Sequence, residues 1–159
     1  MRRYLIPAVL SAALLLLTPA PAAADLTGFL GATTTPATRP ARGFAVGVSL
    51  LVVGFEFEYS RTSEQIDNDA PGLTTGMFNA LVQTPTSGVQ LYATIGGGFF
   101  RERLDTTQET SFGTNIGGGA KIRLAGPVRL RLDFRVFNLR GSALYPTPKR
   151  FYAGLNIAF

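Results

Sequence analysis

Two glutamates, Glu56 and Glu58, stand two positions apart in a run of alternating apolar residues, so both carboxylates are expected on one face of a strand. A carboxylate pair can perform acid–base chemistry, as in glycoside hydrolysis. It can also neutralise basic side chains inside a folded domain, because a buried charge needs a partner. The second interpretation is favoured, since arginines recur with the same alternation later in the chain.

The sequence of 159 residues contains no histidine and no cysteine. Histidine is the commonest general base and metal ligand, and cysteine supplies thiolate nucleophiles, metal ligands and disulfides. An arrangement of Ser, Asp and Glu side chains would therefore lack its usual base. We expect no enzymatic activity, no cofactor and no metal site.

Two further motifs resemble ligand-binding loops without completing them. The glycine triplets at 96–98 and 117–119 are not followed by the lysine and hydroxyl residue of a phosphate loop, so bulges, bends or room for large side chains are expected. The run Asp-Asn-Asp at 67–69 lacks the glutamate that would complete a calcium loop. It is expected to form a solvated turn.

Residues 1–24 are expected to be a cleaved signal peptide. Arg2 and Arg3 precede an apolar run that ends at Leu17, and the alanines at 22–24 offer a cleavage site with small residues. The apolar run is shorter than the ~20 residues that a membrane-spanning helix needs. The mature domain is expected to span 25–159.

After Asp25, apolar residues alternate with small or polar residues in segments of about ten residues, and turn-forming residues separate these segments. Eight strands are predicted, at roughly 25–33, 43–50, 52–61, 74–84, 88–101, 110–125, 127–140 and 149–159. This length suits tilted strands that cross a bilayer, which need ~9 to 11 residues. The fold class predicted is therefore all-β.

The predicted connections alternate in length. The longer and more polar ones fall at 34–42, 62–73, 102–109 and 141–148, and the tight ones fall near 50–52, 85–87 and 125–127. Outer-membrane barrels have short periplasmic turns and longer outer loops. The pattern predicts a closed, antiparallel, up-and-down transmembrane β-barrel of about eight strands, with both ends in the periplasm.

The two faces of the strands differ in polarity. In the seventh segment Leu130, Leu132 and Phe134 alternate with arginines and Asp133, and the second, fourth and fifth segments are nearly uncharged on both faces. A water-soluble barrel would expose charge on every strand, whereas these strands suit lipid outside and a crowded lumen inside. The first and fourth segments alternate poorly, and their faces are left unassigned.

The inward charges are expected to pair with one another. A narrow eight-stranded interior has little room for water, so charge there must be paired. The residues expected in this lumen charge network are Glu56, Glu58, Lys121, Arg123, Arg129, Arg131, Asp133 and Arg135. The network could plug the lumen or line a narrow channel, and both interpretations stay open.

Basic residues near the predicted outer rim could contact lipopolysaccharide phosphates, because charge-assisted hydrogen bonds suit arginine. They are Arg39, Arg42, Arg101, Arg103, Lys149 and Arg150. Ordinary loop solubility would explain them equally well. No basic helix or aromatic nucleic-acid motif accompanies the net charge of +5, so no nucleic-acid partner is expected.

Aromatic residues are expected to form girdles at the membrane interfaces. Those near the outer ends of the strands are Phe44, Tyr59, Phe99, Phe100, Phe112, Phe137, Phe151 and Tyr152. Phe159 marks the periplasmic rim.

The terminal segment FYAGLNIAF resembles the last strand of the small outer-membrane barrels related to the transmembrane domain of outer membrane protein A and to the opacity-type surface proteins. In that family the strand ends in an aromatic residue preceded by alternating apolar residues, which implies recognition by the barrel-assembly machinery. The matching residues here are Phe151, Ala153, Leu155, Ile157 and Phe159.

The leading hypothesis is a non-enzymatic barrel in the cell outer membrane, a structural or surface-interaction scaffold whose loops meet lipopolysaccharide or an external partner. A narrow porin-like diffusion channel for ions or small solutes is the main alternative. A lipid-modifying enzyme is disfavoured by the absence of histidine. A secreted, soluble, lipocalin-like carrier would be indicated by a mature chain that stays monomeric without detergent.

Overall fold

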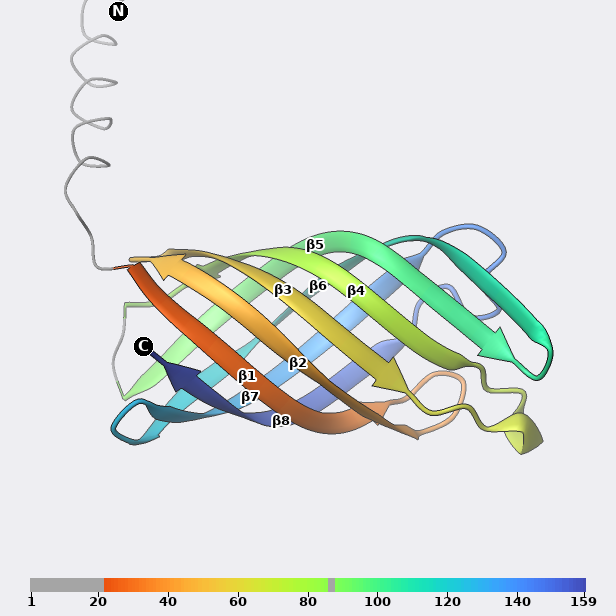
Figure 1. Ribbon diagram of the computed structural model, residues 1–159, viewed down its shortest axis with the longest axis horizontal. Coiled ribbons are helices and arrows are strands. Elements are labelled where there is room, and N and C mark those ends of the chain that lie inside the picture. The colour runs from red at the N-terminus through yellow and green to blue at the C-terminus, as the bar shows by residue number, and fades with distance from the viewer. Residues whose placement is uncertain (1–21, 86–87) are drawn as a thin grey trace, which may run out of the picture.

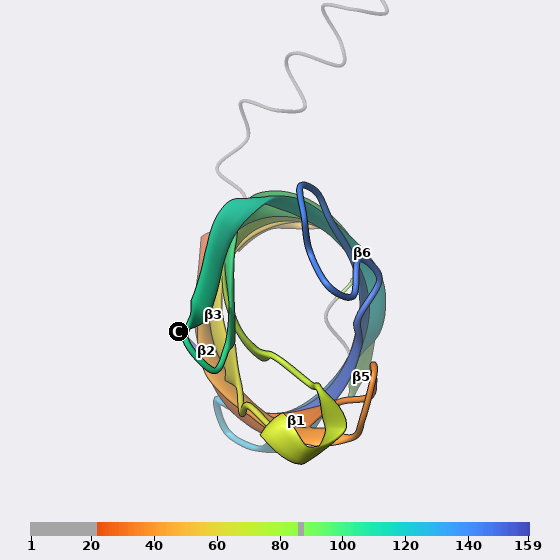
Figure 2. The same ribbon diagram turned by 90° about the vertical axis from the view of Figure 1, so that its right-hand side faces the viewer.

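Eight antiparallel strands close into one barrel in this computed structural model, which describes residues 22–85 and 88–159 (Figures 1 and 2). Each strand pairs with its neighbours in the sequence, and the first pairs with the last. The strands are β1 (Ala22–Thr33), β2 (Arg39–Leu50), β3 (Val53–Thr62), β4 (Gly72–Gln83), β5 (Val89–Leu104), β6 (Thr107–Ala125), β7 (Val128–Leu139) and β8 (Lys149–Ala158). The predicted all-β, closed, up-and-down barrel is confirmed.

The barrel has a turn end and a loop end, at the left and right of Figure 1. The turn end holds the start of β1, the C-terminus and tight connections such as Gly126–Pro127, where Gly126 takes a positive φ of 53°. The loop end holds the connections at 34–38, 63–71 and 140–148. The described part of the chain has no helix that is long and apolar enough to cross a membrane, and the 3-10 helix η1 (Ile66–Asn68) is a single turn.

The predicted outer loop at 102–109 is wrong in extent. β5 and β6 continue to pair up to Leu104 and Thr107, which leaves a two-residue turn at 105–106. Polar residues in this stretch indicated a loop, but strands that rise above a membrane can carry polar side chains on both faces. The hairpin therefore reaches the far right of the loop end as paired strands (Figure 1).

Residues 1–21 carry most of the predicted signal peptide and lie outside the described residues. β1 begins at Ala22, ahead of the predicted domain start at Asp25. Ala24 exchanges two backbone hydrogen bonds of 2.9 Å with Phe159, which helps to close the barrel. Cleavage of a signal peptide stays a prediction.

The barrel has the opposite polarity to a water-soluble protein. Large apolar side chains cover its outside, with Phe55, Phe78 and Leu155 being 60%, 70% and 57% exposed, while Glu58 and Arg131 are fully buried inside. The faces predicted for the seventh strand are confirmed, as is the shared inward face of Glu56 and Glu58 on the third. The structure also assigns the two strands that the sequence left open. The inward residues are Asp25, Thr27, Phe29 and Thr33 on β1, and Leu73, Thr75, Met77, Asn79, Leu81 and Gln83 on β4.

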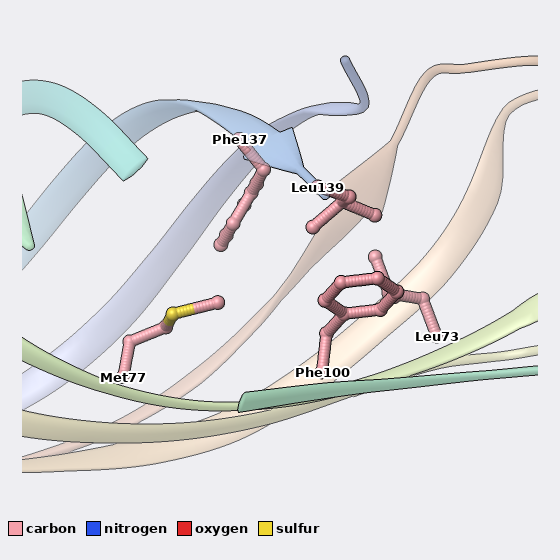
Figure 3. Packing of buried hydrophobic residues seen from close by; sticks show 5 residues of the cluster. All are labelled: Leu73, Met77, Phe100, Phe137 and Leu139. Carbon is pink, nitrogen blue, oxygen red and sulfur yellow. The ribbon is translucent and has the colours of Figure 1, made fainter. Parts of the chain in front are cut away.

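Three of the predicted girdle aromatics lie inside the barrel instead. Phe100, Phe137 and Tyr152 are buried, because each shares the face of the polar residues on its strand. Phe100 and Phe137 join Leu73, Met77 and Leu139 in an apolar cluster that crosses the lumen near the loop end (Figure 3). This lumen cluster fills the interior on the loop side of the charged residues described below.

The two glycine triplets provide space for large inward side chains. β5 and β6 pair without a register shift across both triplets, so the predicted bulges are absent there. A Cβ atom on Gly119 would lie 2.7 Å from the Tyr92 hydroxyl and would also meet the Leu132 carbonyl. The glycine therefore lets Tyr92 reach across the lumen.

Candidate functional site

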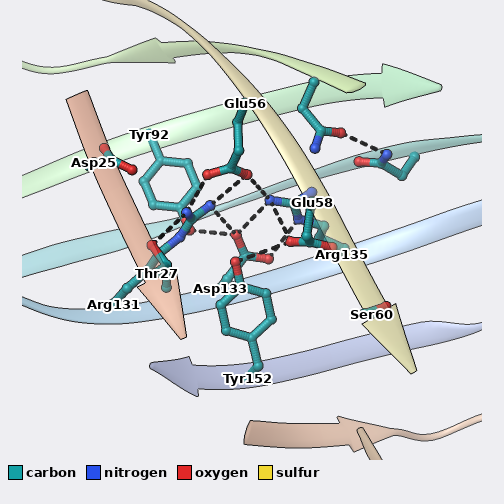
Figure 4. Close-up of polar contacts among 12 residues, drawn as sticks. Asp25, Thr27, Glu56, Glu58, Ser60, Tyr92, Arg131, Asp133, Arg135 and Tyr152 are labelled. Carbon is teal, nitrogen blue, oxygen red and sulfur yellow. Dashed lines mark hydrogen bonds and ion pairs between the residues drawn. The ribbon is translucent and has the colours of Figure 1, made fainter. Parts of the chain in front are cut away.

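The centre of the lumen is occupied by Arg131 of β7, whose guanidinium donates to four side chains, those of Thr27, Glu56, Tyr92 and Asp133 (Figure 4). Its Nη1 and Nη2 both donate to Glu56 of β3, with Nη2 at 3.1 Å from Oε1. Nη2 also lies 3.2 Å from Oδ2 of Asp133, and Nε donates to the Tyr92 hydroxyl at 2.8 Å. Arg131 therefore connects opposite walls of the barrel.

Arg135, four residues after Arg131 on the same face of β7, contacts all three neighbouring carboxylates. Its Nη2 lies 2.9 Å from Oε1 of Glu56 and 3.1 Å from Oε2 of Glu58. Its Nε donates to Oδ1 of Asp133 at 2.9 Å. Glu56 and Asp133 are thus each shared between two arginines.

Arg150 of β8 extends these contacts toward the loop end. It donates to Glu58 and to the Ser60 hydroxyl, and its guanidinium carbon lies 4.8 Å from the centre of the Phe137 ring. Tyr152 donates to the second oxygen of Glu58 at 3.3 Å. We call Glu56, Glu58, Arg131, Asp133, Arg135 and Arg150 the lumen network.

A separate ion pair lies nearer the turn end, where Nζ of Lys121 is 2.6 Å from Oδ2 of Asp25. Together with the lumen network, this pair brings the ion pairs among the described lumen residues to four carboxylates and four basic side chains. The charge therefore balances, which is the condition under which buried ions persist in a low-dielectric interior.

Most of the charged residues predicted for the lumen are brought together, and two are not. Arg123 is exposed at the turn end of β6, and Arg129 is partly exposed and donates to Oε1 of Gln90 at 3.2 Å. Within 22–85 and 88–159, neither forms an ion pair with a carboxylate. Both side chains reach solvent at this rim, so these arginines need no buried partner.

Sequence reasoning missed four inward partners: Asp25, Tyr92, Arg150 and Tyr152. Asp25 lies on the first segment, whose faces were left unassigned, whereas the parity of Tyr92 with Thr94 was a signal that could have placed Tyr92 inside. Arg150 and Tyr152 share the face of Gly154 and Asn156, and this parity was the signal that could have placed them inside.

The geometry offers no access for acid–base chemistry at Glu56 and Glu58. Both carboxylates are buried and bound by guanidinium groups. The cavity beside Asp25, Glu56 and Lys121 measures about 10 Å³, which holds about one water molecule. Across the described residues, no group of three or more acidic side chains is placed to hold a metal ion.

The connections at the loop end are anchored by side chains that accept backbone N–H groups. Glu102 accepts from Leu144 at 3.0 Å and Glu109 accepts from Ser142 at 2.8 Å, so both hold the connection at 140–148. Glu64 accepts from Asp105 at 2.6 Å. These contacts join the connections of the loop end to neighbouring hairpins.

The basic residues predicted to meet lipopolysaccharide divide into two groups. Arg39 and Arg150 are buried, so their assignment to an accessible surface is wrong: Arg39 donates to the carbonyls of Thr35 and Pro71, and Arg150 belongs to the lumen network. Both lie on the inward face of their strands. The outward group is Arg42, Arg101, Arg103 and Lys149.

The predicted assembly residues lie on the outward face of β8 and at its end. Phe151, Leu155, Ile157 and Phe159 are 51%, 57%, 45% and 74% exposed, and Ala153 lies among them. Their recognition by the assembly machinery stays a prediction.

Comparison with known proteins identifies the fold. No protein-family model matches the sequence, and no curated protein matches it significantly. Among solved structures, the N-terminal β-barrel domain of Pseudomonas aeruginosa OprF is similar with a TM-score of 0.66 at 15% identity, covering 86% of this chain and 97% of that domain. Neisserial surface protein A is similar with a TM-score of 0.65 at 14% identity, and the match covers 86% of this chain and 95% of that protein.

The outer-membrane enzyme PagL is also similar, with a TM-score of 0.53 at 12% identity, covering 84% of this chain and 98% of PagL. At these identities the similarity concerns the fold and not the activity. The chain has the fold of the small eight-stranded outer-membrane β-barrels, as the resemblance in its sequence predicted.

Proposed function

We propose that this protein is an outer-membrane β-barrel that serves as a closed, non-enzymatic scaffold and carries its anchored loops at the cell surface. The observation that carries the proposal is the inverted polarity of the barrel. Its outside is apolar along β2, β3, β4, β7 and β8, and its charged side chains are paired inside. In water such an exterior would cause aggregation, whereas in a bilayer it is the stable arrangement.

The contents of the lumen favour a closed scaffold over a diffusion channel. A channel needs a continuous wet path, but the lumen network joins β3 to β7 and the lumen cluster follows it toward the loop end. Side chains from opposite walls thus meet at successive levels. No feature of the described lumen specifically supports conduction, so the narrow porin-like channel is the less favoured function.

A non-enzymatic role is supported by the chain's own residues and not by its fold, since PagL is an enzyme with a similar barrel. The sequence lacks histidine, and the paired glutamates are engaged by arginines. Display is supported by the carboxylates that hold the loop end, because a preformed surface loses less conformational entropy when it binds a partner.

The proposal is tested by expressing the full chain in a Gram-negative bacterium and locating it by membrane fractionation. We expect the chain in the outer membrane, with heat-modifiable mobility on gels and with trypsin access at Arg140 in intact cells, because Arg140 is exposed at the loop end. A chain recovered as a monomer from the periplasm without detergent would overturn the proposal and indicate a soluble carrier.

A further inference from the structure

Four arginines gather on the outside of the barrel at its loop end. Arg42, Arg61, Arg101 and Arg103 line a groove of about 480 Å³ together with Tyr59 and Gln108. All four side chains are exposed, and among the described residues none of them has a carboxylate within ion-pairing distance. With Glu64 also in the lining, the four arginines leave the groove with a net charge of about +3.

The strand register brings these charges to one level of the barrel. Arg42 pairs with Arg61, Arg61 pairs with Thr74, and Thr74 pairs with Arg101 across β2 to β5. Like charges opposite each other on neighbouring strands are destabilising. Glu64, the one acidic residue of the groove, accepts the Asp105 N–H at 2.6 Å. An anion seated among the arginines would relieve their repulsion.

An aromatic row lies directly below the arginines. Phe44 pairs with Tyr59, and Phe99 pairs with Phe112, with Gly76 between the two pairs. The ring centres lie 5.7 Å and 6.1 Å apart within the two pairs. Outward aromatic residues at one level mark the interface between hydrocarbon and headgroups. The arginine groove thus stands at the level of lipid headgroups.

The same four strands carry an apolar groove below the aromatic row. It measures about 440 Å³, and its outward lining side chains are Val46, Val48, Phe55, Phe57, Phe78 and Ile95. Phe57 is four residues below Arg61 on β3, a separation of about 13 Å along the strand. A molecule that fills both grooves must join an anionic head to hydrocarbon chains.

We propose that β2 to β5 bind a doubly phosphorylated glycolipid of the outer leaflet, the lipid portion of lipopolysaccharide, with its phosphates on the arginine groove and its acyl chains on the apolar groove. A phosphomonoester carries about −1.5 to −2 charges at pH 7, so two of them match the net positive charge of the four guanidinium groups and Glu64. Guanidinium binds phosphate oxygens through paired, charge-assisted hydrogen bonds. This inference rests on the proposed location in the outer membrane.

The opposite side of the barrel supplies a matched control. Arg140 and Lys149 are exposed cations near the loop end, beside β7 and β8, and neither lines the groove. The variant Arg61→Gln/Arg101→Gln removes two charges from the groove, and Arg140→Gln/Lys149→Gln removes two charges outside it. All four side chains are exposed, so both variants are expected to fold.

The test uses the full chain refolded in phosphatidylcholine nanodiscs, and native mass spectrometry measures the retention of added lipid A. We expect diphosphorylated lipid A to bind at least about tenfold more tightly than its dephosphorylated form, since each charge-assisted hydrogen bond is worth a factor of this order. Arg61→Gln/Arg101→Gln should remove that preference, and Arg140→Gln/Lys149→Gln should keep it. Inorganic phosphate at millimolar concentration should displace little lipid.

Three results would overturn the inference: equal binding of the two forms of lipid A, equal losses in the two variants, or full displacement by inorganic phosphate, which would indicate a site for a free anion. Comparison of the lipids on the unmodified chain decides the question even where a variant fails to fold. Failure of the unmodified chain to insert into bilayers would instead contradict the proposed function. The two failures are therefore distinguishable.

Discussion

Glu56 and Arg131 meet in the middle of the lumen although β3 and β7 lie on opposite walls of the barrel and share no backbone pairing. Both carboxylate oxygens of Glu56 accept from the one guanidinium, and both residues are buried. A contact of this kind fixes the distance between walls that the sheet alone joins only through intervening strands. It also removes the space that a permeating ion would use.

Arg131→Ala should be strongly destabilising, because it leaves Glu56 and Asp133 with fewer positive partners in a dry interior. Breaking a buried ion pair from one side costs about 3–5 kcal/mol. The measurement is urea unfolding of the refolded chain in detergent micelles. Arg103→Ala, which removes an exposed arginine, should change stability by less than about 0.5 kcal/mol. Equal stabilities of the two variants would show that the lumen network does not hold the barrel.

Gly119→Ala should lower stability by about 1–3 kcal/mol, the usual cost of overpacking, because its Cβ would meet the Leu132 carbonyl and the Tyr92 hydroxyl. Gly28→Ala is the matched control, since nothing lies within 4 Å of a Cβ at that position. That control should be neutral or stabilising, by up to about 1 kcal/mol. Melting followed by circular dichroism compares the two, and a reversed order would contradict the role of Gly119 in making room for Tyr92.

Glu102→Ala/Glu109→Ala should release the connection at 140–148, because the N–H groups of Leu144 and Ser142 lose their acceptors. We expect tryptic cleavage after Arg140 to become about tenfold faster, as the loss of hydrogen bonds to charged groups implies. The rate is measured on refolded protein by gel densitometry. Gln108→Ala alters an exposed side chain of the same hairpin and should leave the rate unchanged. Equal rates in both variants would mean that other contacts hold the loop.

Phe159→Ala should slow assembly in cells without changing the stability of the folded barrel, since the Phe159 side chain is 74% exposed. Pulse-chase labelling of heat-modifiable protein in the outer membrane follows assembly, and urea unfolding follows stability. Phe78→Ala removes an outward phenylalanine of similar exposure, 70%, from the middle of the chain. If Phe78→Ala slowed assembly as much as Phe159→Ala, the C-terminal residue would not be a specific signal.

Most of the fold follows from the sequence because the strands obey one rule, a period of two with unlike faces. Leu130, Leu132 and Phe134 face outward and Arg131 and Asp133 face inward, as their alternation predicts. The first strand was harder because Asp25, Thr27, Phe29 and Gly31 mix charge, polarity and an aromatic ring on one face. No alternation in hydropathy marks such a strand.

Three residues were misplaced for one reason: they were assigned by their position along the strand and not by the face on which they lie. Phe100, Phe137 and Arg150 do lie near the loop end, where girdle aromatics and rim arginines were expected. Each has the parity of the inward residues on its strand, and each is buried. The topology gives the height of a residue along the barrel axis. Its odd or even position in the strand decides whether its side chain points into the lumen or outward, so both are needed to place a residue.

The ion pairs themselves lay beyond the sequence. Alternation places Glu56, Glu58 and the β7 arginines inside, but the partner of each depends on the barrel's closure and on the stagger of its strands. The place of Arg61 among the outer arginines was also missed. Arg61 lies beside Arg42 and Thr74 only because of the strand register, which the sequence does not reveal.

The central claim, a barrel closed by its own side chains, is tested most directly by planar-bilayer conductance of the refolded chain, with Glu56→Ala/Glu58→Ala for comparison. The unmodified protein should be silent, and the double variant should open ion-conducting events, since it removes two carboxylates from the lumen network. Asp67→Ala, which alters an exposed residue of η1, should stay silent. Steady, ion-selective channels in the unmodified protein would contradict the claim and establish a narrow diffusion channel.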